Sequence, residues 1–198
     1  MASNLVRRGG ADRLQFRRVS FDESLEGKLL SDVARQLGEA PLETALDLIL
    51  RGDAGVVSFN MSENDVRELM VQPWTMMGSD GDLVPWMRGV PHPRSYGAFP
   101  HKIRVYARDG DVMSLAGAIR SMTGLTAQVF RIPDRGFLRR GAVADVLVFD
   151  LATVNDPATY ADPHQLAEGM RWVFVNGTAA VADGEFTGML AGRVLGKR

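Results

Sequence analysis

The sequence predicts an α/β protein made of two segments. Helical patterns and short apolar strands alternate up to about residue 132. After about residue 133 the pattern changes to short alternating runs separated by turn pairs such as Asn176-Gly177, which are typical of antiparallel strands. We therefore expect an α/β segment over residues 1–132 and a small β module over residues 133–198. With 198 residues, 45% of them hydrophobic, the chain can bury a sizeable core.

The first fifty residues predict a strand followed by two helices. Apolar residues recur over residues 14–21 in a broken strand pattern. Residues 29–37 place their apolar side chains on one helix face, and Gly38 then suits a left-handed helix end. Pro41 suits the first turn of the next helix, which has a buried apolar stripe of its own.

The rest of the first segment continues the alternation of strands and helices. A variant of the capping box, Ser62 followed by Asp65, predicts the start of a helix. The predicted elements are, in order, a strand at 55–59, a helix at 63–70, a strand at 74–79, a long loop rich in proline and glycine at 80–96, and helices at 99–108 and 114–122. Long loops after barrel strands often carry function.

Asp80 is the candidate catalytic residue on local grounds. It directly follows the predicted strand at 74–79 and lies between small residues. In barrels of alternating strands and helices, the reacting groups lie at the C-terminal ends of the strands. A Ser-Asp-Gly triplet is also common in turns and at helix caps, so a turn and a catalytic carboxylate are both open at this point.

The composition argues against several classes of function. A formal net charge of -1, with both signs mixed along the chain, gives no electrostatic footprint for nucleic acid or for an acidic membrane surface. The absence of cysteine excludes disulfides, thiolate metal sites and a cysteine nucleophile within this chain. No stretch approaches the roughly 20 apolar residues of a membrane span, and the N-terminus lacks the apolar core of a signal peptide. We expect a cytoplasmic protein without a nucleic-acid or membrane partner.

Six short motifs follow one another between Met77 and the end of the chain. They are MGSDG at 77–81, HPRSYGAFP at 92–100, MTGLTA at 122–127, DRG at 134–136, GAVADVLVFD at 141–150 and VNG at 175–177. In this order they strongly resemble the C-terminal part of the N-acyl-D-amino-acid deacylases, which are D-aminoacylases of the amidohydrolase superfamily. The preceding segment at residues 59–66 is similar to the family as well.

The resemblance implies a zinc-dependent TIM-barrel hydrolase that cleaves the linear amide bond of N-acyl-D-amino acids. This chain would then supply the last barrel strands and helices in residues 1–132 and strands of a small β-sandwich in residues 133–198. The family pattern assigns Asp80 the role of the catalytic carboxylate, which takes a proton from the metal-bound water and passes one to the departing amine. Asp80 would also be a shared metal ligand. The arginine of the His-Pro-Arg run implies that Arg94 binds the substrate carboxylate, although on the residues alone it could equally be a surface arginine.

The chain departs from the family in its zinc ligands. The resemblance implies an early His-x-His pair and further histidine or cysteine ligands from middle strands, and this sequence contains neither. Its three histidines, His92, His101 and His164, are 9 and 63 residues apart, so no two have the spacing of a preformed zinc pair. We expect His92 in a loop, His101 in the first turn of a helix, and His164 in the β module far from any site.

Three functions remain open for a chain of this kind. The first is a fragment of a hydrolase acting on N-acyl-D-amino acids, incomplete without the upstream metal-binding half. The second is a non-catalytic fragment or assembly module, and the third is an amidohydrolase acting on a different amide or a cyclic ureide. Because an open sector of a barrel exposes strand edges and an apolar face, we expect a truncated piece, a partner carrying the upstream half of the barrel, or a homo-oligomer.

Overall fold

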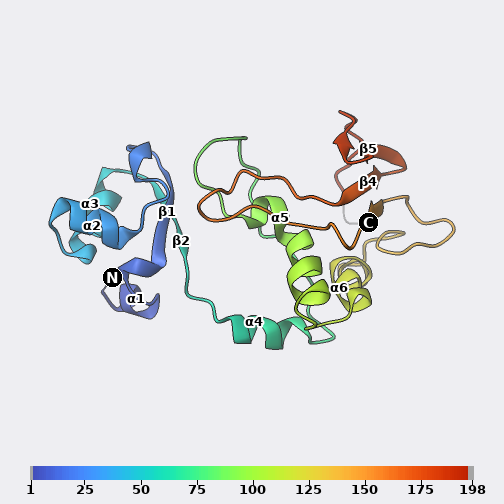
Figure 1. The fold of residues 1–198 in the computed structure, drawn as a ribbon, viewed down its shortest axis with the longest axis horizontal. Helices are drawn as coiled ribbons and strands as arrows, with labels where there is room; N and C mark the ends of the chain where they lie inside the picture. The colour runs from blue at the N-terminus through green and yellow to red at the C-terminus, as the bar shows by residue number, and fades with distance from the viewer. Residues whose placement is uncertain (1, 196–198) are drawn as a thin grey trace. The chain divides into compact units, whose positions relative to one another are not determined.

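The computed structural model describes residues 2–195 and shows an α/β chain (Figure 1). The chain divides into two compact units. The first contains the chain up to Val66 together with Asp80–Tyr96 and Ala158–Gln165, and the second contains Arg67–Ser79, Gly97–Pro157 and the chain from Leu166 onward. The domain boundary that the sequence predicts near residue 133 stays a prediction.

Short helices and strands make up both units. In chain order the helices and strands are α1 (Ala2–Arg7), the 3-10 helix η1 (Ala11–Arg13), β1 (Leu14–Val19), the 3-10 helix η2 (Glu23–Leu25), α2 (Leu30–Leu37), α3 (Pro41–Arg51), β2 (Ala54–Ser58), α4 (Glu63–Met70), α5 (Arg94–His101), the π-helix η3 (Lys102–Arg108), α6 (Leu115–Met122), α7 (Gly124–Val129), β3 (Val146–Phe149), β4 (Met170–Val175), β5 (Thr178–Ala182) and β6 (Glu185–Phe186).

The first unit packs α2 and α3 against the antiparallel pair β1–β2 (Figure 1). Its core contains apolar side chains from β1, η2 and both helices, namely Phe16, Val19, Leu25, Leu30, Val33 and Leu48. The pairing register of β1 shifts between Phe16 and Arg18. Bulges of this kind bend a strand and redirect its side chains, and here the shift falls at Arg17, which contacts the loop at 80–96.

The local predictions for the first unit are confirmed. The strands lie at 14–19 and 54–58, α2 and α3 lie where the apolar stripes predict them, and α4 begins where the capping-box variant predicts a helix. Gly38 ends α2 with a φ of 70°, and the backbone N–H of Asp65 donates to Ser62 Oγ at 3.4 Å. The end of α2 and the start of α4 follow from contacts within a few residues, which a sequence pattern can indicate.

The predicted strand at residues 74–79 is wrong. This stretch belongs to no strand, and the N–H of Met77 instead donates to the carbonyl oxygen of Ser121 at 3.0 Å. A strand needs a neighbour to satisfy its backbone groups. In the part of the chain that the structure describes, the two sheets are β1–β2 and β3–β4–β5–β6, so no strand lies beside residues 74–79.

The predicted helix at 99–108 begins earlier and changes character. It starts at Arg94 as α5 and continues from Lys102 as the π-helix η3, with Pro100 inside it where no N–H is available for the helical ladder. The next helix, α6, begins as predicted, because Ser114 Oγ accepts the N–H of Gly117 at 3.1 Å. Gly124 then opens a further helix, α7.

The β module is one antiparallel sheet with the strand order β3–β4–β5–β6. Asn176 and Gly177 have φ angles of 51° and 81°, as the tight turn predicted there requires. Asp183 and Gly184 have similar φ angles of 51° and 89°. The first turn is held to the entrance of β3 because Asp145 Oδ1 accepts the N–H of Asn176 at 2.8 Å.

Gly136 sits where a side chain would collide with its surroundings. Its φ is +80°, and a Cβ there would lie 2.8 Å from Ala127 Cβ and 2.9 Å from Thr123 O. We expect Gly136→Ala to lower the free energy of unfolding by about 2 kcal/mol. The cost of a left-handed backbone conformation for alanine adds to the cost of the steric overlap of its Cβ. Gly141→Ala is the matched control, because Gly141 has φ +87° with nothing within 4 Å and carries only the strain. Urea unfolding compares the two, and equal losses would show that the contact at Gly136 is unimportant.

Candidate active site

The two site residues predicted from the sequence, Asp80 and Arg94, form an ion pair. Arg94 Nη2 lies 2.6 Å from Asp80 Oδ2. Asp80 has a φ of +47°, a left-handed conformation that aspartate adopts more readily than most residues. Its side chain is 85% exposed and that of Arg94 is 37% exposed. The carboxylate is therefore open to solvent and fixed by a guanidinium that is partly buried.

The two ends of the loop at 80–96 meet at this pair. A Cβ at Gly81 would lie 3.0 Å from Ser95 Cα and 3.3 Å from Arg94 O, so a residue without a side chain permits the close approach. The middle of the loop is held by β1. Arg17 O accepts the N–H of Val90 at 2.8 Å, and Arg17 Nη2 pairs with Asp82 at 2.6 Å. The loop is therefore anchored at its base and along its length.

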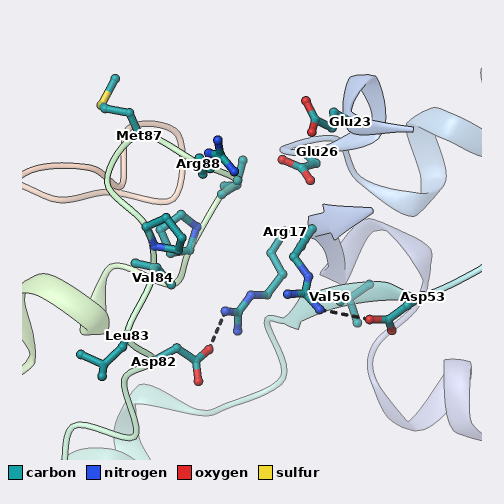
Figure 2. Close-up of a pocket in the computed structure, with 16 residues that line it drawn as sticks. Arg17, Glu23, Glu26, Asp53, Val56, Asp82, Leu83, Val84, Met87 and Arg88 are labelled. Atoms are coloured by element: carbon teal, nitrogen blue, oxygen red, sulfur yellow. Dashed lines mark hydrogen bonds and ion pairs between the residues drawn. The ribbon is translucent and has the colours of Figure 1, made fainter. Parts of the chain in front are cut away.

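A cavity of about 1070 Å³ lies between this loop, β1 and η2 (Figure 2). Figure 2 shows the ion pair of Arg17 with Asp82, and Arg18 pairs with Asp53 in the same cavity. Two further acidic side chains, Glu23 and Glu26, line the same cavity. Two of its arginines are thus paired with carboxylates, and neither Asp80 nor Arg94 is among its lining residues.

A second cavity, of about 420 Å³, contains Arg94. Its lining residues come from Arg13, β1, residues 56–61, His92, Arg94 and Tyr160. Three of these residues are arginines, at positions 13, 17 and 94, and none is acidic. The Nε of Arg94 is buried without a hydrogen-bond acceptor in the described residues. A buried donor of this kind is costly unless a ligand or water supplies an acceptor, so the cavity suits an anionic group.

His92 is fixed beside Arg94 as a neutral ring. Its Nδ1 accepts the backbone N–H of Arg94 at 3.1 Å, and its Nε2 lies 2.9 Å from the hydroxyl of Tyr160. Burial, followed by the positive charges of Arg94 and Arg17, lowers the pKa of His92 to about 4. Both ring nitrogens are occupied, so His92 has no free lone pair for a metal. Its prediction as a loop residue is confirmed.

The lowered pKa of His92 predicts a loss of stability in mild acid. In the unfolded chain histidine takes up a proton near pH 6.5, whereas in the folded chain His92 does so near pH 4. The unfolded state therefore binds more protons between these values, and stability falls as the pH is lowered through them. Between pH 7.5 and pH 5 this linkage removes about 2 kcal/mol.

Urea unfolding of wild type and His92→Gln at both pH values measures this loss. The variant lacks the titrating ring, so it should lose about 2 kcal/mol less than wild type on acidification. The same difference between the two pH values in both proteins would contradict the assignment of a buried neutral ring to His92.

His164 corrects a prediction, because it lies beside the loop at 80–96 and not far from any site. Its Nδ1 is 2.8 Å from the hydroxyl of Tyr96 and accepts the N–H of Met87 at 3.3 Å. Its Nε2 is 3.0 Å from the carbonyl oxygen of Gly89. The contacts join residues 68 to 77 positions apart, so nothing in the local pattern could indicate them. His164 therefore fixes the loop that ends at Arg94.

His101 also differs from its prediction. It is the last residue of α5 and not in the first turn of a helix. Its Nδ1 lies 2.6 Å from Asp156, whose other carboxylate oxygen accepts from Arg104 Nε at 2.6 Å. This cluster holds the segment before β4 to the α5–η3 helix, and its role is structural.

The residues of this chain do not fit a complete metal centre. Among residues 2–195 there is no group of three or more histidine, aspartate or glutamate side chains placed to hold a metal ion. Asp80 is a single carboxylate already paired with Arg94, and the three histidines bond to other protein groups. Zinc sites need three or four protein ligands, so any metal centre would need ligands from outside this sequence.

Comparison with known proteins identifies the family. Residues 4–181 match the amidohydrolase family. The chain belongs to this family. Its sequence is 41% identical over 173 residues to that of a D-aminoacylase from Alcaligenes xylosoxydans xylosoxydans. This match covers 87% of this chain and 34% of the relative. An N-acyl-D-aspartate deacylase of the same organism is 39% identical over 82% of this chain and 31% of its own length.

Solved structures of amidohydrolases match the fold. A D-aminoacylase studied for its binuclear metal centre superimposes with a TM-score of 0.86 and 37% identity, covering 98% of this chain and 39% of that one. An N-acyl-D-glutamate deacylase from Bordetella bronchiseptica, solved with zinc and a phosphonate inhibitor, gives a TM-score of 0.79 and 34% identity over 90% of this chain and 37% of that one. This amidohydrolase chain spans about a third of the length of the curated relatives it matches. In residues 2–195, no helix is long and apolar enough to cross a bilayer.

Proposed function

We propose that this chain supplies the general base and the carboxylate-binding residue of a hydrolase that cleaves N-acyl-D-amino acids. The observation that carries the proposal is the Asp80–Arg94 pair, with 2.6 Å between Oδ2 and Nη2. In an N-acyl-amino acid the carboxylate carbon is three bonds from the scissile carbonyl carbon. A guanidinium that contacts both Asp80 and the substrate carboxylate would therefore keep the base close to the bond that breaks.

Asp80 is suited to proton transfer by its exposure and its fixed position. As general base it would take a proton from the attacking water while the water oxygen bonds to the amide carbonyl carbon. When the carbon–nitrogen bond breaks, the same carboxyl group would return a proton to the departing amine. Arg94 would hold the substrate carboxylate through paired N–H groups, which recognise a carboxylate bidentately.

Zinc is the cofactor we propose for the assembled enzyme, with Asp80 as a shared ligand. Support comes from the similar solved structures. One is a D-aminoacylase studied for its binuclear metal centre, and another is an N-acyl-D-glutamate deacylase solved with zinc. The ligand set of this chain does not form a metal centre by itself, so we assign no step of the reaction to the metal here. The remaining ligands would come from the upstream half of a TIM barrel.

We further propose that residues 1–132 are the C-terminal section of that barrel and residues 133–198 belong to a small β-sandwich. The single antiparallel sheet β3–β4–β5–β6 supports the second part. The upstream half of the barrel, or a second copy of this chain, would be the partner. Large exposed apolar side chains support a partner, among them Trp74 at 69%, Leu138 at 84% and Leu190 at 99% exposure. A cytoplasmic location stays a prediction.

The proposed function is tested by exchanging this chain into a relative. In a chimera, this chain replaces the matching region of the Alcaligenes D-aminoacylase, and hydrolysis of N-acetyl-D-leucine and N-acetyl-L-leucine is measured by amine release. We expect hydrolysis of the D-enantiomer and at least about 100-fold slower hydrolysis of the L-enantiomer. A folded, zinc-loaded chimera that hydrolyses neither enantiomer would overturn the proposal.

A further inference from the structure

The directions of the hydrogen bonds around His92 leave the hydroxyl hydrogen of Tyr160 without an acceptor. His92 Nδ1 faces the N–H of Arg94 at 3.1 Å and must accept it. A neutral histidine with an accepting Nδ1 carries its hydrogen on Nε2. That hydrogen points to the oxygen of Tyr160, 2.9 Å away. Tyr160 therefore accepts from His92, and its own O–H is left to donate elsewhere.

Tyr160 has no other hydrogen-bond partner among residues 2–195, and it lines the cavity that contains Arg94. Its ring is fixed edge-on against Phe59 and His92, with centroid separations of 4.7 Å and 5.0 Å. Burial raises the pKa of Tyr160, so the phenol keeps its hydrogen at neutral pH. Accepting a hydrogen bond from His92 also polarises the phenol and strengthens its O–H as a donor.

The same cavity holds a second donor without an acceptor. Arg94 Nε is buried and unpaired in the described structure, and Arg13 adds positive charge to the cavity wall. The two donors line about 420 Å³ of cavity without an acidic lining residue, and Arg94 and Arg17 each also pair with a carboxylate outside that lining, Asp80 and Asp82. Two donors without acceptors in one small cavity match the needs of one carboxylate. The larger cavity in Figure 2 differs, because four acidic residues line it: Glu23, Glu26, Asp53 and Asp82.

We propose that the Tyr160 hydroxyl donates a hydrogen bond to the ligand carboxylate held by Arg94, and that His92 is the positioning residue for Tyr160. This inference deepens the proposed function and rests on its assignment of Arg94 to a carboxylate. It assigns the ligand three contacts: two from the guanidinium and one from the phenol. The segment at Ala158–Gln165 thereby contributes a binding group to a site that also contains Arg13, β1, residues 56–61 and the loop at 80–96.

Calorimetric titration of the purified chain tests the phenol with two ligands that differ only in charge. The ligands are N-acetyl-D-leucine and N-acetyl-D-leucinamide, which lacks the carboxylate. Tyr160→Phe keeps the ring and removes the hydroxyl. We expect it to weaken binding of the acid roughly 10-fold and to leave binding of the amide within about twofold. An unchanged Kd for the acid, equal weakening for both ligands, or no binding of the acid by wild type would overturn the inference.

A double-mutant cycle tests the role of His92. Because His92 acts through Tyr160, His92→Phe should weaken binding of the acid, and the double variant His92→Phe, Tyr160→Phe should bind it no more weakly than Tyr160→Phe alone. Additive losses would contradict a positioning role. The chimera assay with the D- and L-substrates is independent of these titrations. Hydrolysis with no Tyr160 effect would overturn this inference alone, and a Tyr160 effect without hydrolysis would overturn the proposed function alone.

Discussion

Replacing Asp80 with asparagine is expected to lower kcat for N-acetyl-D-leucine hydrolysis about 10³-fold in the chimera. The amide has the shape of the carboxylate and can still accept a hydrogen bond from Arg94, whose Nη2 lies 2.6 Å away. It cannot take a proton from water at neutral pH. The loss should therefore appear in kcat, and KM should change little, because Arg94 would still bind the substrate carboxylate.

Asp53→Asn provides the matched control for this loss. Asp53 is also an exposed aspartate paired with an arginine, Arg18, at 3.1 Å, but it lies outside the cavity that contains Arg94. Exposed pairs contribute little, so kcat should stay within about twofold of the parent. Activity retained in Asp80→Asn, or an equal loss in both variants, would remove Asp80 from the mechanism.

Asp156→Ala is expected to lower the free energy of unfolding by about 3 kcal/mol. The Asp156 side chain is 8% exposed and accepts from both His101 and Arg104 at 2.6 Å. Its Cβ also packs so closely on α5 that a Cβ at Gly97 would lie 2.7 Å from it. Removing the carboxylate leaves a partly buried guanidinium without its partner, which costs more than a surface ion pair contributes.

Urea unfolding of the chain measures this effect, with Asp109→Ala as the control. Asp109 pairs with Arg108 at the same 2.6 Å but is 49% exposed, so its removal should change stability far less. Asp156→Asn should fall between wild type and Asp156→Ala because the amide keeps one acceptor. Equal losses in Asp109→Ala and Asp156→Ala would show that the cluster at Asp156 contributes no more than a surface pair.

Elements governed by neighbouring residues could be predicted from the sequence. The end of α2 at Gly38 and the turn at Asn176-Gly177 depend on backbone conformations that few residues adopt. The start of α6 depends on one side-chain bond from Ser114. The strand predicted at 74–79 failed because a strand depends on partners that no local pattern reveals.

The residues of the candidate site likewise include some that the sequence could predict and some that it could not. Asp80 and Arg94 were predicted from a motif and a resemblance, and the structure brings them together at the ends of one loop. Tyr160 and His164 were missed, because each reaches the loop at 80–96 across 68 or more residues. Only a three-dimensional arrangement could identify Tyr160 as a candidate binding group.

We propose that this chain carries the general base, Asp80, and the carboxylate-binding residue, Arg94, but not a complete metal site. Zinc content per chain, measured by elemental mass spectrometry after dialysis, tests it most directly. We expect well below one zinc in the chain alone and about one or more in the chimera with the remaining part of the Alcaligenes D-aminoacylase. About one tightly held zinc in the chain alone would contradict the account.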